Sequence, residues 1–456
     1  MSTLAYMAIA VAALVPRLLF ALLAPAHGGD DLVYFRVAEN IYQHLCVSMS
    51  DPASGACVPH WGGNHYPGFP AFIALSFVLF GHHALAPLLG AIAVTVGAIL
   101  RLTYAVRRFT GSAGVALAAG LCAALSPLQV AWARFVLTEA LFVALAVWLL
   151  AELLLSLSER RLRIVPVALA IAAAAFVRHD GLLFAVPVAV AGFAVHAPAV
   201  AIRRGAVIGI LIALPLAAWA WRCTNAGLSL LPPALLTTDG APAPLGYMQW
   251  RRTWEVTSYE AAGAQYGVNT RTYRDISLPA AALDRPGRPG ADRAVVEPLL
   301  AELGTHMGEP FPPHIDAAFR ALARERRQED PMTYWAWLPL RRAWHMWFDP
   351  LASMGWPAEA RGAGIALSVS GGGLGGLLQA ALANPGVALT KGLVSGYRMA
   401  LIALFVAIGV AVSRRWPNPI AVVVAMAGAF AVARTVFFVA MLATQSRYLV
   451  AIVPLF

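Results

Sequence analysis

Long apolar runs separated by short polar segments dominate the chain. An α-helix needs about 20 apolar residues to cross the hydrocarbon core of a bilayer, and most of these runs approach or exceed that length. The pattern predicts an all-α polytopic membrane protein with about nine or ten transmembrane helices. We place the spans at residues 4–26, 84–106, 112–130, 135–156, 164–178, 181–200, 205–223, 393–413 and 418–442.

The first apolar run, Leu4–Pro25, is longer than the apolar segment of a typical secretory signal peptide. Such signals also begin with a basic stretch, and this run has none ahead of it. We therefore expect it to be retained as the first transmembrane helix.

Basic residues cluster at alternate ends of the spans. Short loops rich in Arg face the cytoplasm in multi-pass proteins. A cytoplasmic amino terminus satisfies every cluster at once: Arg107-Arg108, Arg160-Arg161 with Arg163, Arg203-Arg204 and Arg414-Arg415. The orientation places residues 27–83 outside the cytoplasm.

A shorter apolar run, Tyr66–Phe80, contains about 15 residues, too few for a comfortable span. Pro67 and Pro70 lie in its first turn. As a further span it would reverse every later assignment and move Arg107-Arg108 outside. We expect a juxtamembrane helix that lies along the outer membrane face.

Residues 224–392 are richer in Pro, Gly and charged side chains than the spans, and are expected to form a large extracytoplasmic segment. The predicted organisation is a transmembrane core at 1–223 with its first extracytoplasmic loop at 27–83, then this segment, then carboxy-terminal transmembrane helices at 393–456. Within the segment, Tyr334–Phe348 carries four tryptophans beside basic residues. Amphipathic aromatic side chains of this kind favour the membrane–water boundary.

Composition agrees with the membrane prediction: 60% of the 456 residues are hydrophobic and 12% are charged. A soluble domain has about 25% charged residues. The net charge of +10 comes almost wholly from Arg, with Lys391 the single lysine. Most Arg residues flank apolar runs, where they set topology and meet lipid headgroups, so we expect no nucleic-acid partner.

An acidic pair, Asp30 and Asp31, follows the first predicted helix. Adjacent carboxylates repel each other, and a carboxylate near low dielectric can take a proton from an acceptor hydroxyl. Acidic residues are also favoured at the start of a helix, here Leu32–Leu45. The sequence leaves both roles open.

Further charged residues are expected near the same outer face. Glu139 lies in an apolar helix, five positions after Arg134, and pairs either with a substrate or with another helix. Arg178 begins the turn Arg178-His179-Asp180. It either binds phosphate or is an ordinary residue of a solvated turn. Weaker candidates on this face are Arg36, His65, Tyr66, Lys391, Arg447 and Tyr448.

Two of the four cysteines, Cys46 and Cys57, flank the polar stretch Val47–Ala56. In an oxidising compartment they are candidates for a disulfide. Two cysteines alone make a poor metal site.

Five short motifs in order resemble the GT-C membrane glycosyltransferases, most closely the aminoarabinose transferase and protein O-mannosyltransferase group. They are Gly29–Asn40, His65–Pro70 leading to Leu79–Gly81, Ser126-Pro127 through Thr138-Glu139, Arg178–Gly181 and Arg447–Leu449. The resemblance covers residues 1–223 and 393–456, and the intervening segment does not match.

The resemblance implies a GT-C-like fold and inverting transfer of a sugar from a polyprenyl-phosphate carrier, outside the cytoplasm. It makes Asp30 the expected base and Asp31 the second acid. His65 replaces a Lys near the donor phosphate, and Val33 replaces a basic residue. We therefore expect phosphate contacts from Arg36, Arg178, Lys391 and Arg447. Donor or substrate contacts are also expected from His65, Tyr66, Arg134, Glu139 and Tyr448.

These cations can neutralise a phosphate, so no metal or other cofactor is expected to be required. The expected partners are the lipid-linked sugar, membrane lipids and an acceptor that is a lipid, a glycan or a protein. The expected location is the inner membrane of a bacterium. A transporter or flippase of an anionic or lipid-linked substrate is the alternative, because it too would use charges within the membrane.

Overall fold

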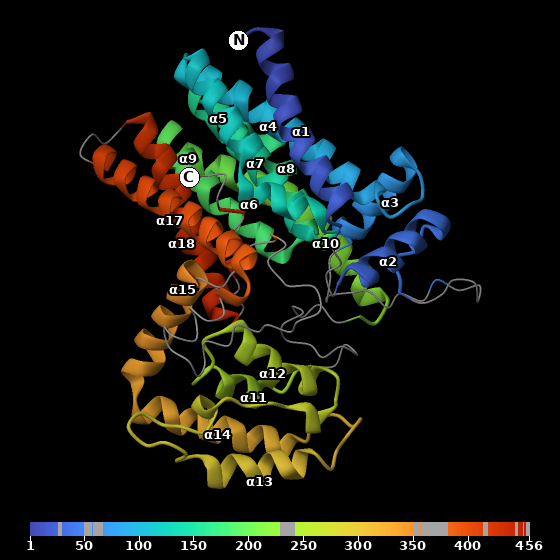
Figure 1. Ribbon diagram of the computed structural model, residues 1–456, viewed down its shortest axis with the longest axis vertical. Coiled ribbons are helices and arrows are strands. Elements are labelled where there is room, and N and C mark those ends of the chain that lie inside the picture. The colour runs from blue at the N-terminus through green and yellow to red at the C-terminus, as the bar shows by residue number, and fades with distance from the viewer. Residues whose placement is uncertain are drawn as a thin grey trace.

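The computed structural model describes residues 1–25, 30–49, 57, 67–228, 242–349, 356, 382–413, 418–442, 446–449 and 451–452. This part of the chain is helical and contains no β-strand, which confirms the all-α prediction. A bundle of apolar helices carries a smaller helical lobe, residues 242–349, at one end (Figure 1). We refer to this end as the lobe end of the bundle.

The bundle contains most of the predicted spans. Its helices are α1 (Thr3–Leu23), α4 (Ala86–Thr110), α5 (Ala113–Leu125), α7 (Thr138–Ser158), α8 (Ile164–Val177), α9 (Ala185–Val195), α10 (Pro198–Asn225), α17 (Pro385–Ser413) and α18 (Pro419–Ala440). Six described helices, α1, α4, α7, α10, α17 and α18, are each long and apolar enough to cross a membrane. The chain is thus a multi-pass membrane protein.

Two predicted spans are not single helices. The span at 112–130 breaks at Ser126, whose backbone is not helical (φ −53°, ψ 113°), and α6 (Pro127–Val130) starts with a proline that has no N–H to donate. The 3₁₀-helix η2 (Ala131–Arg134) follows, and the pieces are bent by 41°. The span at 181–200 becomes the 3₁₀-helix η3 (His179–Phe184), then α9, before α10 begins at Pro198.

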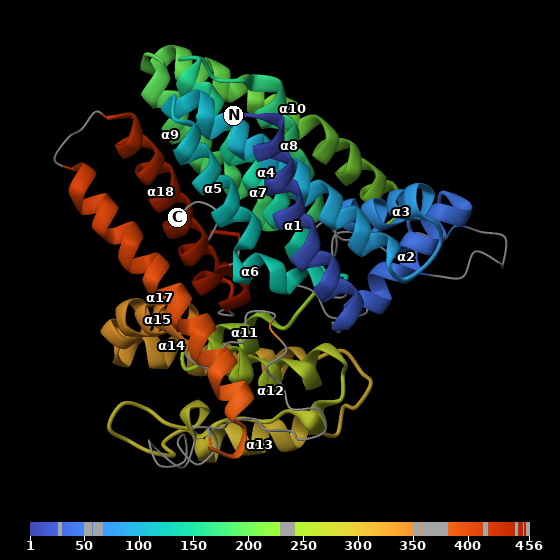
Figure 2. The same cartoon turned by 45° about the horizontal axis from the view of Figure 1, so that its top comes forward.

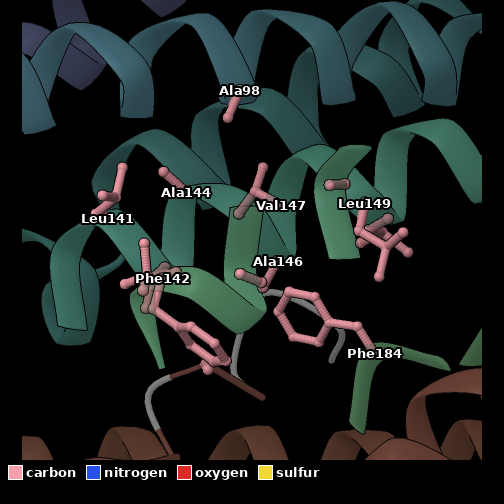
Figure 3. Close-up of a cluster of buried hydrophobic side chains, with 14 of the residues drawn as sticks. Ala98, Leu141, Phe142, Ala144, Ala146, Val147, Leu149 and Phe184 are labelled. Atoms are coloured by element: carbon pink, nitrogen blue, oxygen red, sulfur yellow. The ribbon is translucent and has the colours of Figure 1, made fainter. Parts of the chain in front are cut away.

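Small side chains bring α4 and α7 close together. Ala98 and Ala105 of α4 are fully buried, as are Ala144 and Ala151 of α7, at seven-residue spacing on each helix. In lipid, small residues allow the close backbone approach that gives dispersion contacts between helices. Figure 3 shows Ala98 above α7, and Phe142 and Phe184 on the opposite side of α7, 5.0 Å apart between ring centroids.

A buried arginine compensates for the break after α5. Arg17 of α1 donates from Nη1 to Ala124 O (2.6 Å) and from Nη2 to Ala123 O (3.3 Å). The last carbonyls of a helix have no partner within the helix, and in a bilayer no water replaces it. Arg17 therefore satisfies the carbonyls that the break leaves unpaired.

Two short helices, α2 (Asp31–His44) and α3 (Gly68–Phe80), project from the lobe end (Figure 2). They pack through Tyr34 and Phe69, whose ring centroids are 5.0 Å apart. A disulfide joins Cys46 to Cys57 after α2. α3 also contacts α4 and α8, and the structure contains no membrane, so its predicted position along the membrane face stays a prediction.

The lobe has a hydrophobic core of its own. Its helices are α11 (Leu245–Arg251), α12 (Ser258–Asn269), α13 (Arg293–Leu303), α14 (Pro313–Glu329) and α15 (Leu338–Phe348). Tyr247, Trp250 and Phe319 are fully buried at its centre, with the Trp250 and Phe319 rings 4.7 Å apart.

α15 connects the lobe to the bundle. At its lobe side Arg342 donates to the backbone carbonyls of Glu255 (2.8 Å) and Arg252 (2.7 Å). Towards its carboxyl end Trp347 Nε1 donates to Thr435 Oγ1 of α18 (2.9 Å). Because both contacts come from one helix, the lobe is held at a defined place on the bundle.

Candidate functional site

Four charged side chains meet where α7 begins, α8 ends and α18 approaches its carboxyl end. They are Glu139, Arg178, Asp180 and Arg434, and we call them the charge cluster. Asp180 and Arg434 are each 1% exposed and Glu139 is 6% exposed. Charges at this depth are retained only when they are paired.

Asp180 lies between two guanidinium groups. Arg178 Nε donates to its Oδ1 (2.9 Å) and Arg434 Nη1 donates to its Oδ2 (2.6 Å). Arg434 also donates from Nη2 to Tyr448 O (2.8 Å). Both carboxylate oxygens are therefore occupied, and two cations favour the ionised form, so Asp180 is suited to holding the arginines rather than to taking a proton.

Arg178 is the more accessible arginine of the cluster. Its Nη1 donates to Thr138 Oγ1 (2.9 Å) and to Glu139 Oε1 (3.4 Å). Its side chain is 14% exposed, against 1% for Arg434. Its Nη2 makes no hydrogen bond with any described residue. This nitrogen is available to an anionic group that enters the site.

Aromatic rings surround the two arginines. The Tyr448 ring lies 5.1 Å from Arg178 Cζ and is stacked on Phe438 at 4.2 Å. The Phe142 ring is 5.5 Å from Arg178 Cζ and 5.2 Å from Arg434 Cζ. Cation–π contacts offset part of the cost of burying these cations and fix the planes of their guanidinium groups.

Two small hollows lie along α7. The polar hollow, with about 10 Å³ of space for a water-sized molecule, is lined by Glu139, Phe142, Val143, Arg178, Arg434, Tyr448 and Ala451. The apolar hollow, also with about 10 Å³ of space for a water-sized molecule, lies further along α7 and is lined by Ala146, Leu149, Leu150, Leu153, Phe184, Pro187, Val423, Met426, Ala427 and Phe430. Cations thus line the hollow near the start of α7, and apolar side chains line the hollow further along it.

Local backbone geometry places Arg178 and Asp180. α8 ends at Val177, and Arg178 is extended (φ −150°, ψ 135°), which turns the chain back into η3. Gly181 N donates to Arg178 O (2.8 Å) and closes this turn. A side chain at Gly181 would collide with the backbone of Ala174, so only glycine fits there.

The acidic pair lies at the start of α2. Asp30 is exposed at the N-cap position but makes no capping hydrogen bond with its side chain. Asp31 is buried, and its Oδ1 accepts a hydrogen bond from Leu32 N (2.8 Å). The acidic pair therefore belongs to the start of α2, whereas the charge cluster is built from the start of α7, the turn after α8, and α18.

The other predicted residues are more scattered. Arg36 is exposed on α2, and Lys391 is half-buried on α17. Arg134 lies over the Phe135 ring at 4.7 Å, and Glu139 forms an ion pair with Arg178, the residue that follows α8. His65 and Tyr66 lie outside the described residues, as does the side chain of Arg447.

Two members of the cluster are not among the predicted site residues: Asp180, which enters the sequence prediction only as part of the turn after Arg178, and Arg434. Arg434 lies within the predicted span 418–442, and length and hydrophobicity alone are the basis of that prediction. The signal that singled out Glu139, a charge inside an apolar helix, applies equally to Arg434.

Unpaired polar atoms line the broken helix near the same end. Ser126 Oγ, Gln129 Oε1 and Trp132 Nε1 are buried without a hydrogen-bond partner among the described residues. Such atoms are uncommon and mark sites that a polar ligand can satisfy. No group of three or more His, Cys, Asp or Glu side chains in the described ranges is arranged to hold a metal ion, and the metal requirement stays a prediction.

Comparison with known proteins agrees with the resemblance drawn from the sequence. Residues 64–221 match the family model described as dolichyl-phosphate-mannose-protein mannosyltransferase. The predicted family resemblance is confirmed for this part of the chain, which includes three members of the charge cluster. A solved structure described as ArnT from Cupriavidus metallidurans bound to undecaprenyl phosphate aligns with 100% of this chain and 77% of that chain, with a TM-score of 0.41 and 15% identity. No curated protein matches the chain.

Proposed function

We propose that this protein transfers a sugar from a polyprenyl-phosphate carrier to an acceptor hydroxyl, with inversion at the anomeric carbon. The match of residues 64–221 to a family of mannosyltransferases supports the reaction class. The observation that carries the choice of donor is the pair of hollows along α7, with cations in one and apolar walls in the other. A lipid phosphate has this same division into an anionic head and a hydrocarbon tail.

The arginines have unequal roles in this proposal. Arg178 contacts the donor phosphate through its Nη2, because it is the accessible cation of the cluster. Arg434 acts through Asp180, which it binds at 2.6 Å, and so holds Arg178 in place. Preorganised cations stabilise negative charge as it develops on the leaving phosphate. Glu139 and Thr138 orient the other edge of Arg178.

The transfer is a single displacement. The acceptor oxygen bonds to the anomeric carbon as the bond from that carbon to the phosphate oxygen breaks, and the released carrier keeps the bonding electrons. Asp30 receives the proton of the acceptor hydroxyl, which its exposed position at the start of α2 permits. Asp31 bonds the backbone of α2 and holds the acidic pair in position.

The site is proposed to face away from the cytoplasm, in the inner membrane of a bacterium. The Cys46–Cys57 disulfide lies at the lobe end, and disulfides persist in oxidising compartments. The lobe then lies over the site on the side where the acceptor arrives. A lipid, a glycan or a protein can supply the acceptor hydroxyl.

The test is transfer of labelled sugar from polyprenyl phosphate by purified protein in detergent. We expect Asp30→Asn and Arg178→Ala to lose at least 100-fold in kcat/KM, on the order expected for a general base or a phosphate contact. The matched control is Asp275→Asn, an exposed carboxylate of the lobe, which should retain full activity. Product stereochemistry reports inversion directly.

Carrier length separates the tail contact from the phosphate contact. Ala427 lines the apolar hollow, and Ala427→Leu narrows it. This variant should raise KM for a long-chain carrier while leaving KM for a carrier of two or three isoprene units almost unchanged.

Full activity of Asp30→Asn would refute its role as base. Absence of transfer with every donor, together with movement of labelled lipid across vesicles, would establish the transporter instead.

A further inference from the structure

The structure leaves a row of large apolar side chains exposed on the outer side of α15 and the π-helical turn before it, η7 (Thr333–Trp337). Trp335 is 68% exposed, Trp337 58% and Trp344 67%. Met332 and Leu340 are similarly exposed. Each Trp side chain carries roughly 200 Å² of surface, so the row exposes several hundred Å², as large as patches that bind a partner.

The spacing places most of these residues on one stripe. Trp337, Leu340, Arg341 and Trp344 follow the three- and four-residue intervals that align side chains along one face of a helix. Phe348 continues the stripe, with its ring 4.3 Å from that of Trp344. We call Trp337, Leu340, Arg341, Trp344 and Phe348 the aromatic stripe.

The aromatic stripe ends at a transmembrane helix. Trp347, next to Phe348, is hydrogen-bonded to Thr435 of α18. Thr435 lies five residues before the end of α18 at Ala440, which is about 7 Å along the helix. The carboxyl end of α15 therefore lies beside a membrane span, and from there the stripe runs along the edge of the molecule towards the lobe (Figure 1).

A bilayer headgroup layer matches this stripe in chemistry and in length. Trp prefers the boundary between hydrocarbon and water, and an exposed Arg such as Arg341 can pair with lipid phosphate. From Trp337 to Trp344 the helix rises about 10 Å, comparable to the headgroup layer of about 5 to 8 Å on each side once the helix is tilted. A stripe that binds a second protein would not need to lie at the level where a transmembrane helix ends.

We propose that the aromatic stripe lies in the lipid headgroup layer on the lobe side and docks the lobe onto the membrane surface. This contact is independent of the transfer reaction. It predicts an order of depth: Trp344 is deepest, Trp337 is shallower, and Trp335, nearer the lobe, has the least lipid contact.

Photo-crosslinking tests the order. The full chain is placed in nanodiscs of phosphatidylcholine and phosphatidylglycerol, with p-benzoylphenylalanine at one position at a time: 344, 337, 335 or 266. Tyr266 is the matched control, because it is an aromatic residue of the lobe that is 62% exposed and lies on α12. We expect the yield of lipid adduct to fall at least threefold at each step from 344 to 337 to 335, and none at 266.

A second measurement does not depend on the substituted residue being tolerated. Brominated lipids quench nearby tryptophans, so the wild-type protein should lose more fluorescence in them than Trp337→Phe/Trp344→Phe does. Adducts between two copies of the chain at position 344, in place of lipid adducts, would overturn the proposal and identify a protein interface. Equal lipid yields at 344 and 266 would also overturn it.

Discussion

Asp180 shows how one carboxylate can organise two arginines. It binds Arg178 and Arg434 with separate oxygens, at 2.9 and 2.6 Å, and all three side chains are largely enclosed. Removing one partner of a buried pair leaves an uncompensated charge, which costs more than the pair contributes. The cluster is therefore sensitive to any change that alters its charge balance.

Asp180→Asn should destabilise the protein by about 3–5 kcal/mol, because two arginines lose their shared counter-charge. The double variant Asp180→Asn/Arg434→Met removes one positive and one negative charge and should recover part of that loss. Thermal unfolding in detergent measures both. A single variant as stable as the wild type would contradict the pairing seen in the structure.

Glu255 provides a pH-dependent case outside the membrane. Burial raises the pKa of this carboxyl group above its ordinary value of 4.5, against the opposing effect of Arg251, which bonds it at 2.8 Å. A raised pKa means that the folded state binds the proton more tightly than the unfolded state. The stabilisation that the protonated Glu255 gives the folded state is therefore fully present below pH 4.5, and it is lost as the pH rises through the pKa of the folded state.

Glu255→Gln removes that titration. The stability of the wild type relative to this variant should be highest in acid and should fall as the pH rises from 4.5, as followed by thermal unfolding of the full chain. Glu297→Gln, an exposed carboxylate on α13, is the control and should leave the pH profile unchanged. A stability difference that does not vary with pH would contradict the raised pKa.

At the residue scale, the sequence could identify charged side chains but not their partners. Glu139 and Arg178 stand out because each interrupts an apolar pattern. Arg434 and Asp180 are 254 residues apart, and no local spacing rule relates positions so distant. Only the packing of α18 against η3 and α9 brings them together.

At the scale of elements, apolar length predicts that a helix exists but not where it breaks. The predicted span 112–130 divides at Ser126-Pro127, although Pro127 was visible in the sequence. A proline does not always end a membrane helix: α1 continues through Pro16. What makes the break tolerable is Arg17, on another helix, whose donors reach the carbonyls left at the end of α5.

Arg17→Met tests this capping. Met has a side chain of similar length to Arg but cannot donate to Ala123 and Ala124. The loss of these bonds to two buried carbonyls should lower the free energy of unfolding by about 2–4 kcal/mol. Thermal unfolding in detergent gives the loss. Arg17→Lys keeps one cationic donor group, and its unfolding temperature should lie between those of the wild type and Arg17→Met. If Arg17→Met unfolds at the wild-type temperature, these carbonyls have other partners.

At the scale of the molecule, the bundle and the lobe correspond to the apolar and polar parts that composition distinguishes. The lobe's internal core could not be predicted in detail, because its contacts join helices such as α11 and α14 that are far apart in the chain. Its anchoring through Arg342 and Trp347 also depends on tertiary packing. The distribution of basic residues predicts separately which end of the bundle faces the cytoplasm.

The lobe end should face away from the cytoplasm. α7 begins at the charge cluster, and its 21 residues span about 30 Å, which carries the chain to the basic cluster Arg160-Arg161 at the other end. Short basic loops stay in the cytoplasm. With the exposed Cys122 replaced by Ser, Tyr266→Cys should react with a membrane-impermeant maleimide in intact cells, whereas Arg161→Cys should react only after permeabilisation. The reverse result would place the charge cluster on the cytoplasmic side, where the Cys46–Cys57 disulfide could not persist.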